Sequence, residues 1–143
     1  MPCSAALASL PHGPGFRFVD EITALDPGKS GDGRYAVRGD EAFLDAHFPG
    51  NPMMPGVILI EALAQLGGVV AQSDPAVPPL GDVRLAAVQA AKITGSAVPG
   101  ETLTIRARIT GRLGPLVQIQ GEVLAGDRPL LTARITLSGA VSI

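Results

Sequence analysis

Apolar and polar residues alternate through the last third of the chain. Between residues 102 and 110, Leu103, Ile105 and Ile109 occupy one side of a period-two pattern whose other positions carry threonine and arginine. This pattern is typical of a β-strand with one buried face. It returns at residues 117–123 and 131–137, after turn-forming residues at 111–115 and 126–129. The sequence therefore predicts a meander of three antiparallel strands.

Shorter strand-like segments precede this meander. Residues 16–24 and 34–38 are predicted to be strands, and the turn between them covers residues 26–31, which contain proline, glycine and serine. Residues 83–88 form a further predicted strand with a weaker pattern. The proline-rich stretch 73–81 is too short to separate two domains, so we expect a surface loop there.

Residues 57–72 break the alternation. Apart from Glu61 and Gln65, this segment is apolar on every side before its last residue, which is typical of a helix buried in a core. It is shorter than the ~20 residues that cross a bilayer and it carries an acid, so no membrane span is predicted. Since strands flank it in the sequence, we expect an α+β fold in which an antiparallel sheet wraps around one long central helix.

Chain length and composition narrow the function classes. The 143 residues suit a single domain over 1–143, of which about the first nine are expected to be loosely ordered. Hydrophobic residues make up 46% and charged residues 17%, which is apolar for a soluble monomer and predicts an oligomer. The net charge of −2 and an aromatic content of 3% argue against a nucleic-acid partner, which needs positive charge and stacking surfaces.

The N-terminus and the cysteine content bear on the cellular compartment. The single cysteine, Cys3, allows neither an intrachain disulfide nor a cysteine-based metal cluster. The first ten residues lack the basic and apolar regions of a signal peptide. Together these features predict a cytoplasmic protein.

Glu61 and Gln65 are the polar residues within the predicted helix. They are four residues apart and therefore share one helix face. Burying an ionised carboxylate is costly, so Glu61 needs a partner, a polar pocket or a raised pKa. A carboxyl that keeps its proton near neutral pH is what a general acid requires. An acid that packs at a helix end or at a subunit contact fits the helix pattern equally well.

The segment 47–56 lies just before this helix and contains three prolines and two glycines. These residues fix an irregular chain path, which indicates a positioned loop. His47 begins the segment, and imidazole is the usual base for proton abstraction near neutral pH. A lone histidine is nevertheless more often structural, and His12, which lies among prolines and glycines, is assigned that role.

Gly56 stands at the expected N-terminus of the helix. Backbone N–H groups there lack partners within the helix, and the helix dipole favours negative charge. A glycine lets a thioester carbonyl approach its N–H closely, as an oxyanion site requires. A glycine needed only for the turn explains the residue equally well.

These residues belong to one long motif. It comprises His47-Phe48-Pro49-Gly50, Pro52, Met54-Pro55-Gly56-Val57, Glu61-Ala62 and Ala64-Gln65. The motif resembles the active-site segment of the FabZ-type 3-hydroxyacyl-acyl-carrier-protein dehydratases. The resemblance covers nearly everything after about residue 10, because it continues at Leu10-Pro11-His12, Asp26-Pro27-Gly28-Lys29 and Val98-Pro99-Gly100-Glu101.

The resemblance implies a fold, an assembly and a reaction. The implied fold is the hot-dog fold, and the implied working unit is a homodimer, often assembled as a hexamer of three dimers, with no metal and no organic cofactor. The implied reaction dehydrates a (3R)-3-hydroxyacyl chain, linked through phosphopantetheine to acyl carrier protein, to the trans-2-enoyl product in fatty acid biosynthesis. His47 matches the family's catalytic histidine, Glu61 its catalytic acid and Gly56 its backbone donor to the thioester oxygen.

The resemblance also implies residues around the substrate. Phe48, Pro55, Val57 and Gln65 are expected to bind substrate. Lys92 and Arg84 are candidates for contacting the acidic carrier protein, although a lysine that serves only solubility explains Lys92 equally well. Glutamate at position 61 is similar to the branch that only dehydrates, as against the related branch that also isomerises the new double bond.

The chain departs from the family pattern at Pro14-Gly15, Arg84-Leu85 and Gln89. These positions belong to the expected acyl tunnel, so the preferred chain length stays open. Two alternative functions also stay open. One is a hot-dog thioesterase in which Glu61 activates water, and the other is a non-catalytic subunit that binds acyl chains or pairs with an active homologue.

Overall fold

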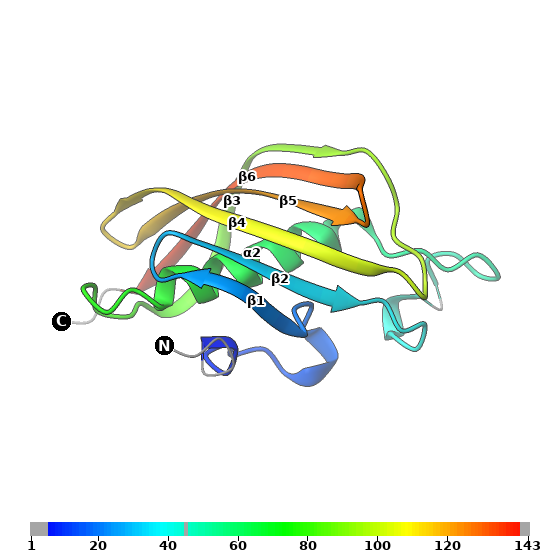
Figure 1. Ribbon diagram of the computed structural model, residues 1–143, viewed down its shortest axis with the longest axis horizontal. Helices are drawn as coiled ribbons and strands as arrows, with labels where there is room; N and C mark the ends of the chain where they lie inside the picture. Colours follow the sequence, from blue (N-terminus) through cyan, green and yellow to red (C-terminus); the bar gives the residue numbers. More distant parts are fainter. Residues whose placement is uncertain (1–5, 45, 141–143) are drawn as a thin grey trace.

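Six antiparallel strands and one long helix make up most of the residues that the structure describes, which are 6–44 and 46–140 of a computed structural model (Figure 1). The helix is α2 (Gly56–Gln72), and two short 3-10 helices, η1 (Pro14–Phe16) and η2 (Ala42–Leu44), precede it. The strands are β1 (Glu21–Asp26), β2 (Ser30–Ala36), β3 (Gly81–Ile93), β4 (Thr102–Leu113), β5 (Leu116–Ala125) and β6 (Arg128–Ala140).

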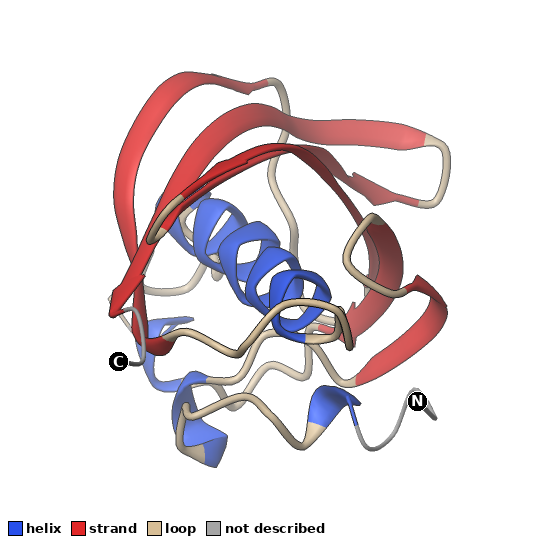
Figure 2. Cartoon of the chain, turned by 90° about the vertical axis from the view of Figure 1, so that its left-hand side faces the viewer, coloured by secondary structure: helices blue, strands red, loops and turns tan. Residues whose placement is uncertain are grey.

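The strands form a single sheet in the order β1-β2-β4-β5-β6-β3. The sheet curves around α2, which lies against its concave face (Figure 2). Strands β4, β5 and β6 form the predicted meander, while β3 crosses over to pair with β6 at one edge of the sheet. This arrangement is the α+β hot-dog architecture that the sequence predicts.

Helix α2 forms where the apolar run predicts it, one residue longer at its start. Pro55 occupies the N-cap position, and no side chain caps the first turn. At the other end the Ser73 hydroxyl donates to the Val70 carbonyl at 2.7 Å. Ten residues of the helix are buried, so its stability comes from packing inside the sheet rather than from solvent-exposed helix propensity.

The hydrophobic core fills the space between α2 and the sheet. Leu59, Leu63 and Leu66 of the helix are fully buried, as are the inward positions of the meander strands. The alternation in the sequence thus marks the buried face correctly. The fully buried side chains on these strands are Leu103, Ile105, Val117, Ile119, Val123, Leu130, Leu131 and Ile135.

The remaining strands differ from the sequence prediction in their bounds. Strand β1 begins at Glu21 and β2 at Ser30, where the pattern predicts strands over 16–24 and 34–38. Strand β3 extends over 81–93, well beyond the predicted 83–88. Each difference has a physical cause in a neighbouring element.

The N-terminal segment lies against the rest of the chain where the structure describes it. Residues 1–5, including Cys3, lie outside the described residues. Ala6 is buried, and Ser9 donates its backbone N–H to the Ala6 carbonyl at 3.1 Å. Among the described residues, no helix combines the length and the apolar character needed to cross a membrane.

Candidate active site

His47 is held by the loop that precedes α2. Its Nδ1 lies 3.0 Å from the Met53 carbonyl oxygen, and its own carbonyl accepts the Met53 N–H at 2.8 Å. Since a carbonyl oxygen only accepts, the proton of a neutral imidazole sits on Nδ1 in this contact. Nε2 then carries a lone pair, so His47 is oriented as a proton acceptor.

Phe48 packs on the imidazole of His47. The two rings are stacked at a centroid distance of 4.2 Å, and the peptide bond between the residues is cis. Phe48 and Asn51 exchange backbone hydrogen bonds of 3.1 and 2.9 Å, which closes the loop into a tight turn. The Phe48 side chain remains 50% exposed, so its outer face is free to contact another molecule.

The first turn of α2 brings Gly56 beside Ile93 of strand β3. A Cβ atom built on Gly56 would lie 2.6 Å from Ile93 Cδ1, so a larger residue would displace that side chain. Without a capping side chain, the first N–H groups of the helix can donate to a bound oxygen. Val57 is 67% exposed and points away from the core.

Glu61 follows Gly56 by five residues, or about one and a half helical turns, and is half-buried. It lines a cavity of about 580 Å³ between α2, the N-terminal segment and the start of β3. Burial raises the pKa of this carboxyl above its ordinary value, and the neighbouring Gln65 side chain offsets part of that rise. Glu61 therefore keeps its proton to higher pH than a solvated glutamate does, which suits a proton donor.

Gln65 supports the wall of this cavity. Its Oε1 accepts the Phe18 N–H and its Nε2 donates to the Phe16 carbonyl, both at 2.8 Å. The side chain is buried, so these bonds satisfy its amide and tie the N-terminal segment to the helix. Gln65 thus lines the cavity with its polar atoms bonded to the N-terminal segment, and its role in substrate binding stays a prediction.

The structure brings some of the predicted residues together and separates others. Glu61, Gln65 and Arg84 line the same cavity. Among the described residues, those lining this cavity do not include His47 or Gly56. A single chain therefore does not place the candidate base beside the candidate acid in one enclosed space.

Arg84 and Lys92 are well separated although they share strand β3. Arg84 pairs with Ser138 and Lys92 pairs with Thr132 on β6. Six residues of strand separate those partners, which corresponds to about 20 Å. Within one chain the two cations therefore belong to different surfaces.

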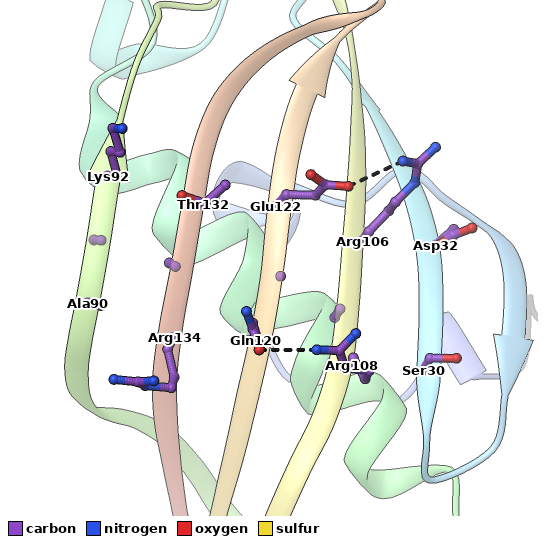
Figure 3. Close-up of a pocket in the computed structure, with 14 residues that line it drawn as sticks. Ser30, Asp32, Ala90, Lys92, Arg106, Arg108, Gln120, Glu122, Thr132 and Arg134 are labelled. Atoms are coloured by element: carbon purple, nitrogen blue, oxygen red, sulfur yellow. Dashed lines mark hydrogen bonds and ion pairs between the residues drawn. The ribbon is translucent and has the colours of Figure 1, made fainter.

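Lys92 faces outward on the far side of the sheet from α2, in a shallow groove (Figure 3). The groove carries four cations and two acids. Glu122 pairs with Arg106 at 3.2 Å, and Arg108 donates to Gln120 at 3.1 Å. The remaining positive charge gives this outer face a basic character. The charged residues of the groove are Asp32, Lys92, Arg106, Arg108, Glu122 and Arg134.

Sequence reasoning overlooked two features of these surfaces. Arg108 and Arg134 share the basic face with Lys92, and the alternation of the strands alone would have placed them outward. His12, expected to be structural, lines the Glu61 cavity, and its buried Nδ1 has no hydrogen-bond partner among the described residues. The matching Leu10-Pro11-His12 segment was the available signal.

Comparison with known families decides the assignment of the chain. Residues 10–134 match the family model described as a FabA-like domain. The chain belongs to the FabA-like family. Its FabA-like relatives include 3-hydroxyacyl-[acyl-carrier-protein] dehydratase FabZ from Desulforamulus reducens, 38% identical over 130 residues that cover 87% of this chain and 90% of the relative. The protein of the same name from Clostridium acetobutylicum is 35% identical over 127 residues, 89% of each chain.

Solved structures share the hot-dog fold of this FabA-like chain. The dehydratase heterocomplex ApeI:P from Xenorhabdus doucetiae matches with a TM-score of 0.79 at 16% identity, covering 99% of this chain and 93% of that one. A structure of a hypothetical thioesterase protein with coenzyme A from Streptococcus pneumoniae matches with a TM-score of 0.64 at 14% identity, covering 85% of this chain and 88% of that one. At such identities the likeness concerns the fold.

Proposed function

We propose that this chain dehydrates a (3R)-3-hydroxyacyl group carried on acyl carrier protein to the trans-2-enoyl product, in fatty acid biosynthesis. FabA-like relatives that match most of the chain carry the name 3-hydroxyacyl-[acyl-carrier-protein] dehydratase. The chain is thus a hydro-lyase. The observation that carries the chemistry is the combination of an imidazole oriented as a base at His47 with a carboxyl at Glu61 whose burial raises its pKa.

The reaction follows from three groups. His47 Nε2 takes the proton from C2, and the electron pair of that C–H bond forms the C2–C3 double bond. The Gly56 N–H stabilises the negative charge that grows on the thioester oxygen. Glu61 gives its proton to the C3 hydroxyl, which departs as water when the C3–O bond breaks. Each acid or base contributes ~10²–10⁴-fold, and the oxyanion donor contributes ~10²–10³-fold.

Residues beside these groups bind the substrate in this proposal. Phe48 and Val57 expose apolar surface at the loop and at the start of α2, where the thioester end of the substrate would pass. Pro55 fixes the chain direction at the helix start, and Gln65 maintains the wall of the Glu61 cavity through its bonds to the N-terminal segment. No metal or organic cofactor takes part in the proposed reaction.

The working unit in this proposal is a homodimer formed through strand β3. This strand lies at the edge of the sheet and pairs only with β6 among the described strands. Its free side exposes backbone groups together with apolar side chains, including Val88 at 45% and Ile93 at 49%. Such an edge favours pairing with another strand, and two copies of β3 can pair with each other about a two-fold axis.

Pairing of two β3 strands would complete the active site. In one chain the Glu61 cavity does not include His47. Arg84 and Leu85 of β3 line the Glu61 cavity, and Ile93 of β3 lies beside Gly56, where the loop that begins at His47 enters the helix. We therefore propose that each site combines His47 of one chain with Glu61 of the other. A hexamer of three such dimers stays a prediction, as does a cytoplasmic location.

The same dimer would reunite the two cations proposed to dock the carrier protein. A two-fold axis at Val88, near the middle of β3, would place Arg84 of one chain opposite Lys92 of the other. The basic groove around Lys92 of one chain would then lie beside Arg84 of the other. Acidic carrier protein would dock there by charge complementarity.

The test of the function is a direct assay. Purified protein is mixed with 3-hydroxyacyl carrier proteins of several chain lengths, and absorbance of the conjugated enoyl thioester is followed. An increase in that absorbance without release of free carrier thiol supports a dehydratase. Thiol release from saturated acyl carrier protein would instead identify a thioesterase, and neither signal would indicate a subunit that only binds.

A further inference from the structure

The cavity that contains Glu61 runs along one face of helix α2. The helix positions that line it recur at the spacing of a single helical face. They extend from residue 61 to residue 72, and these eleven steps correspond to about 16 Å along the helix axis. The cavity is therefore elongated and starts at the proposed acid. The lining residues from the helix are Glu61, Ala64, Gln65, Gly68, Val69 and Gln72.

The lining beyond Glu61 suits an apolar occupant. Val69, Leu80 and Leu137 contribute apolar side chains to the walls, and the charged residues Asp82 and Arg84 lie on the β3 side of the cavity. At the far end Gln72 donates to the Leu80 carbonyl at 2.6 Å and accepts the Leu80 N–H at 3.0 Å. These bonds satisfy the amide of Gln72, so it makes no demand for a polar ligand. An alkyl chain fits such a channel.

Two adjacent glycines in α2 have different surroundings. Glycine inside a helix costs ~0.5–1 kcal/mol relative to alanine, so each calls for a reason. For Gly67 the reason is packing, because a Cβ atom would collide with Ile119 of β5. Packing gives no reason for a glycine at position 68, because a Cβ atom there would meet only Leu137 Cδ1, at an ordinary contact distance of 3.8 Å.

The positions of these glycines explain the contrast. Gly68 lines the cavity, whereas Gly67 faces the core and does not. The absence of a side chain at Gly68 therefore leaves room in the channel rather than room for a neighbouring strand. The free-energy cost of a glycine inside the helix is then offset by binding of the molecule that occupies this space.

We propose that Gly68 determines how long an acyl chain this site accepts, an inference that rests on the proposed dehydratase function. Gly68 follows Glu61 by seven residues, or about 10 Å. An extended chain advances ~1.2 Å per bond, so about eight bonds beyond C3 reach this point. Acyl groups of about ten carbons or fewer end before Gly68, and those of twelve or more pass it.

The test compares Gly68→Ala and Gly68→Leu with the unaltered protein on 3-hydroxyacyl carrier proteins of four and fourteen carbons. Gly68→Leu should lower kcat/KM for the fourteen-carbon substrate at least ~10-fold relative to the four-carbon one, because the added side chain fills the channel. Four-carbon turnover should stay within about twofold. Gly68→Ala is the matched control, since it removes the glycine yet adds one methyl group where there is room, and it should raise the Tm.

Three outcomes separate this inference from the proposed function. An unchanged ratio of fourteen- to four-carbon turnover in a folded Gly68→Leu protein overturns the role of Gly68. An equal shift in Gly68→Ala also overturns it, because helix flexibility rather than space would then be responsible. If the unaltered protein dehydrates neither substrate, the function fails, and binding of saturated four- and fourteen-carbon acyl carrier proteins then tests the channel alone.

If Gly68→Leu does not fold, Gly68→Met provides the same bulk with a more adaptable side chain. A lowered ratio of fourteen- to four-carbon turnover in that variant supports the role of Gly68, and an unchanged ratio overturns it. A thermal melt beside each assay identifies which variant is folded.

Discussion

The Nδ1 atom of His47 lies 3.0 Å from the carbonyl oxygen of Met53, six residues further along the same loop. This contact fixes both the tautomer and the direction of the imidazole, since the carbonyl requires a donor. The catalytic capacity of His47 thus depends on the shape of the loop that returns Met53 beside it. The three prolines of segment 47–56 restrict that shape.

The first prediction concerns the two proposed catalytic side chains. His47→Ala removes the base and Glu61→Gln removes the transferable proton, so each change should lower kcat for dehydration by at least ~10²-fold. Neither residue belongs to the fully buried core, so both variants should remain folded at the assay temperature. Steady-state kinetics and a thermal melt measure the two quantities. Near-normal turnover in a folded variant would remove that residue from the mechanism.

The second prediction concerns stability and pH. Burial raises the folded-state pKa of Glu61 above its ordinary value of 4.5, so the protonated side chain costs little below that value. As pH rises through the raised pKa, the carboxyl ionises against its apolar surroundings and stability is lost. Glu61→Gln stays neutral throughout. The Tm of this variant should therefore exceed that of the unaltered protein by a margin that grows as pH rises above 4.5 and levels off above the raised pKa, and a margin that does not change with pH would contradict the assignment.

The central helix and the meander could be predicted because each has its own internal signal. The apolar run at 57–72 forms a buried helix because it is apolar on nearly every side, and the alternation of 102–110 is kept in β4 because one face packs on that helix. The residues Glu61 and Gln65 were correctly placed on one helix face for the same reason. Local periodicity is enough to predict an element where the buried positions repeat with the period of that element.

The remaining strands depend on neighbours that the local pattern does not reveal. Phe18 and Val19 are both buried although they are adjacent, because the Phe18 N–H bonds to the Gln65 side chain rather than to a strand. In β2 the inward positions Gly31 and Gly33 carry no side chain, since α2 approaches closely there, so no apolar alternation marks the strand.

Strand β3 was underestimated because it is exposed on most of its length. Its residues show no alternation, and pairing with β6 rather than burial defines its bounds. The exposed edge also explains why the sequence does not reveal how the site is assembled. In the proposed dimer, the position of His47 relative to Glu61 depends on the strand that pairs with the free edge of β3.

The third prediction concerns the basic face. Lys92→Glu and Arg84→Glu should each raise KM for the carrier-protein substrate several-fold, because they replace attraction to an acidic partner by repulsion. A short pantetheine thioester should be turned over as before by Lys92→Glu, since Lys92 lies outside the Glu61 cavity. The effect should weaken as salt screens the charges.

Lys29→Glu is the control for this experiment, because it makes the same charge change at an exposed position between β1 and β2. A comparable rise of KM in this control would assign the effect to net charge. Equal effects of Lys92→Glu on the carrier-protein and pantetheine substrates would end the docking proposal.

The fourth prediction concerns the dimer edge. Val88→Arg places a charge in the middle of the exposed apolar edge, where two β3 strands are proposed to meet, and it should shift the protein toward monomer. Thr23→Arg on β1, the opposite edge of the sheet, is the control and should leave the assembly unchanged. Analytical ultracentrifugation reports both masses. A Val88→Arg protein that remains as dimeric as the control would place the interface elsewhere.

The fifth prediction concerns how each active site is composed. If His47 of one chain serves with Glu61 of the other, a mixed dimer of His47→Ala and Glu61→Gln chains has one site with both defects and one site with neither. Mixing the two inactive proteins after reversible dissociation should therefore restore activity. Random exchange makes half of the dimers mixed, each with one intact site of two, so about a quarter of the unaltered activity is expected.

The alternative composition gives the opposite result. If His47 and Glu61 of the same chain form each site, every site in the mixture keeps one defect, and activity stays at the level of the parent proteins. Native mass spectrometry of chains that differ by an affinity tag shows whether mixed dimers have formed. Their presence without recovered activity would refute the shared site while leaving the hydro-lyase assignment intact, because that assignment rests on the turnover of the unaltered protein and not on which chain supplies each group.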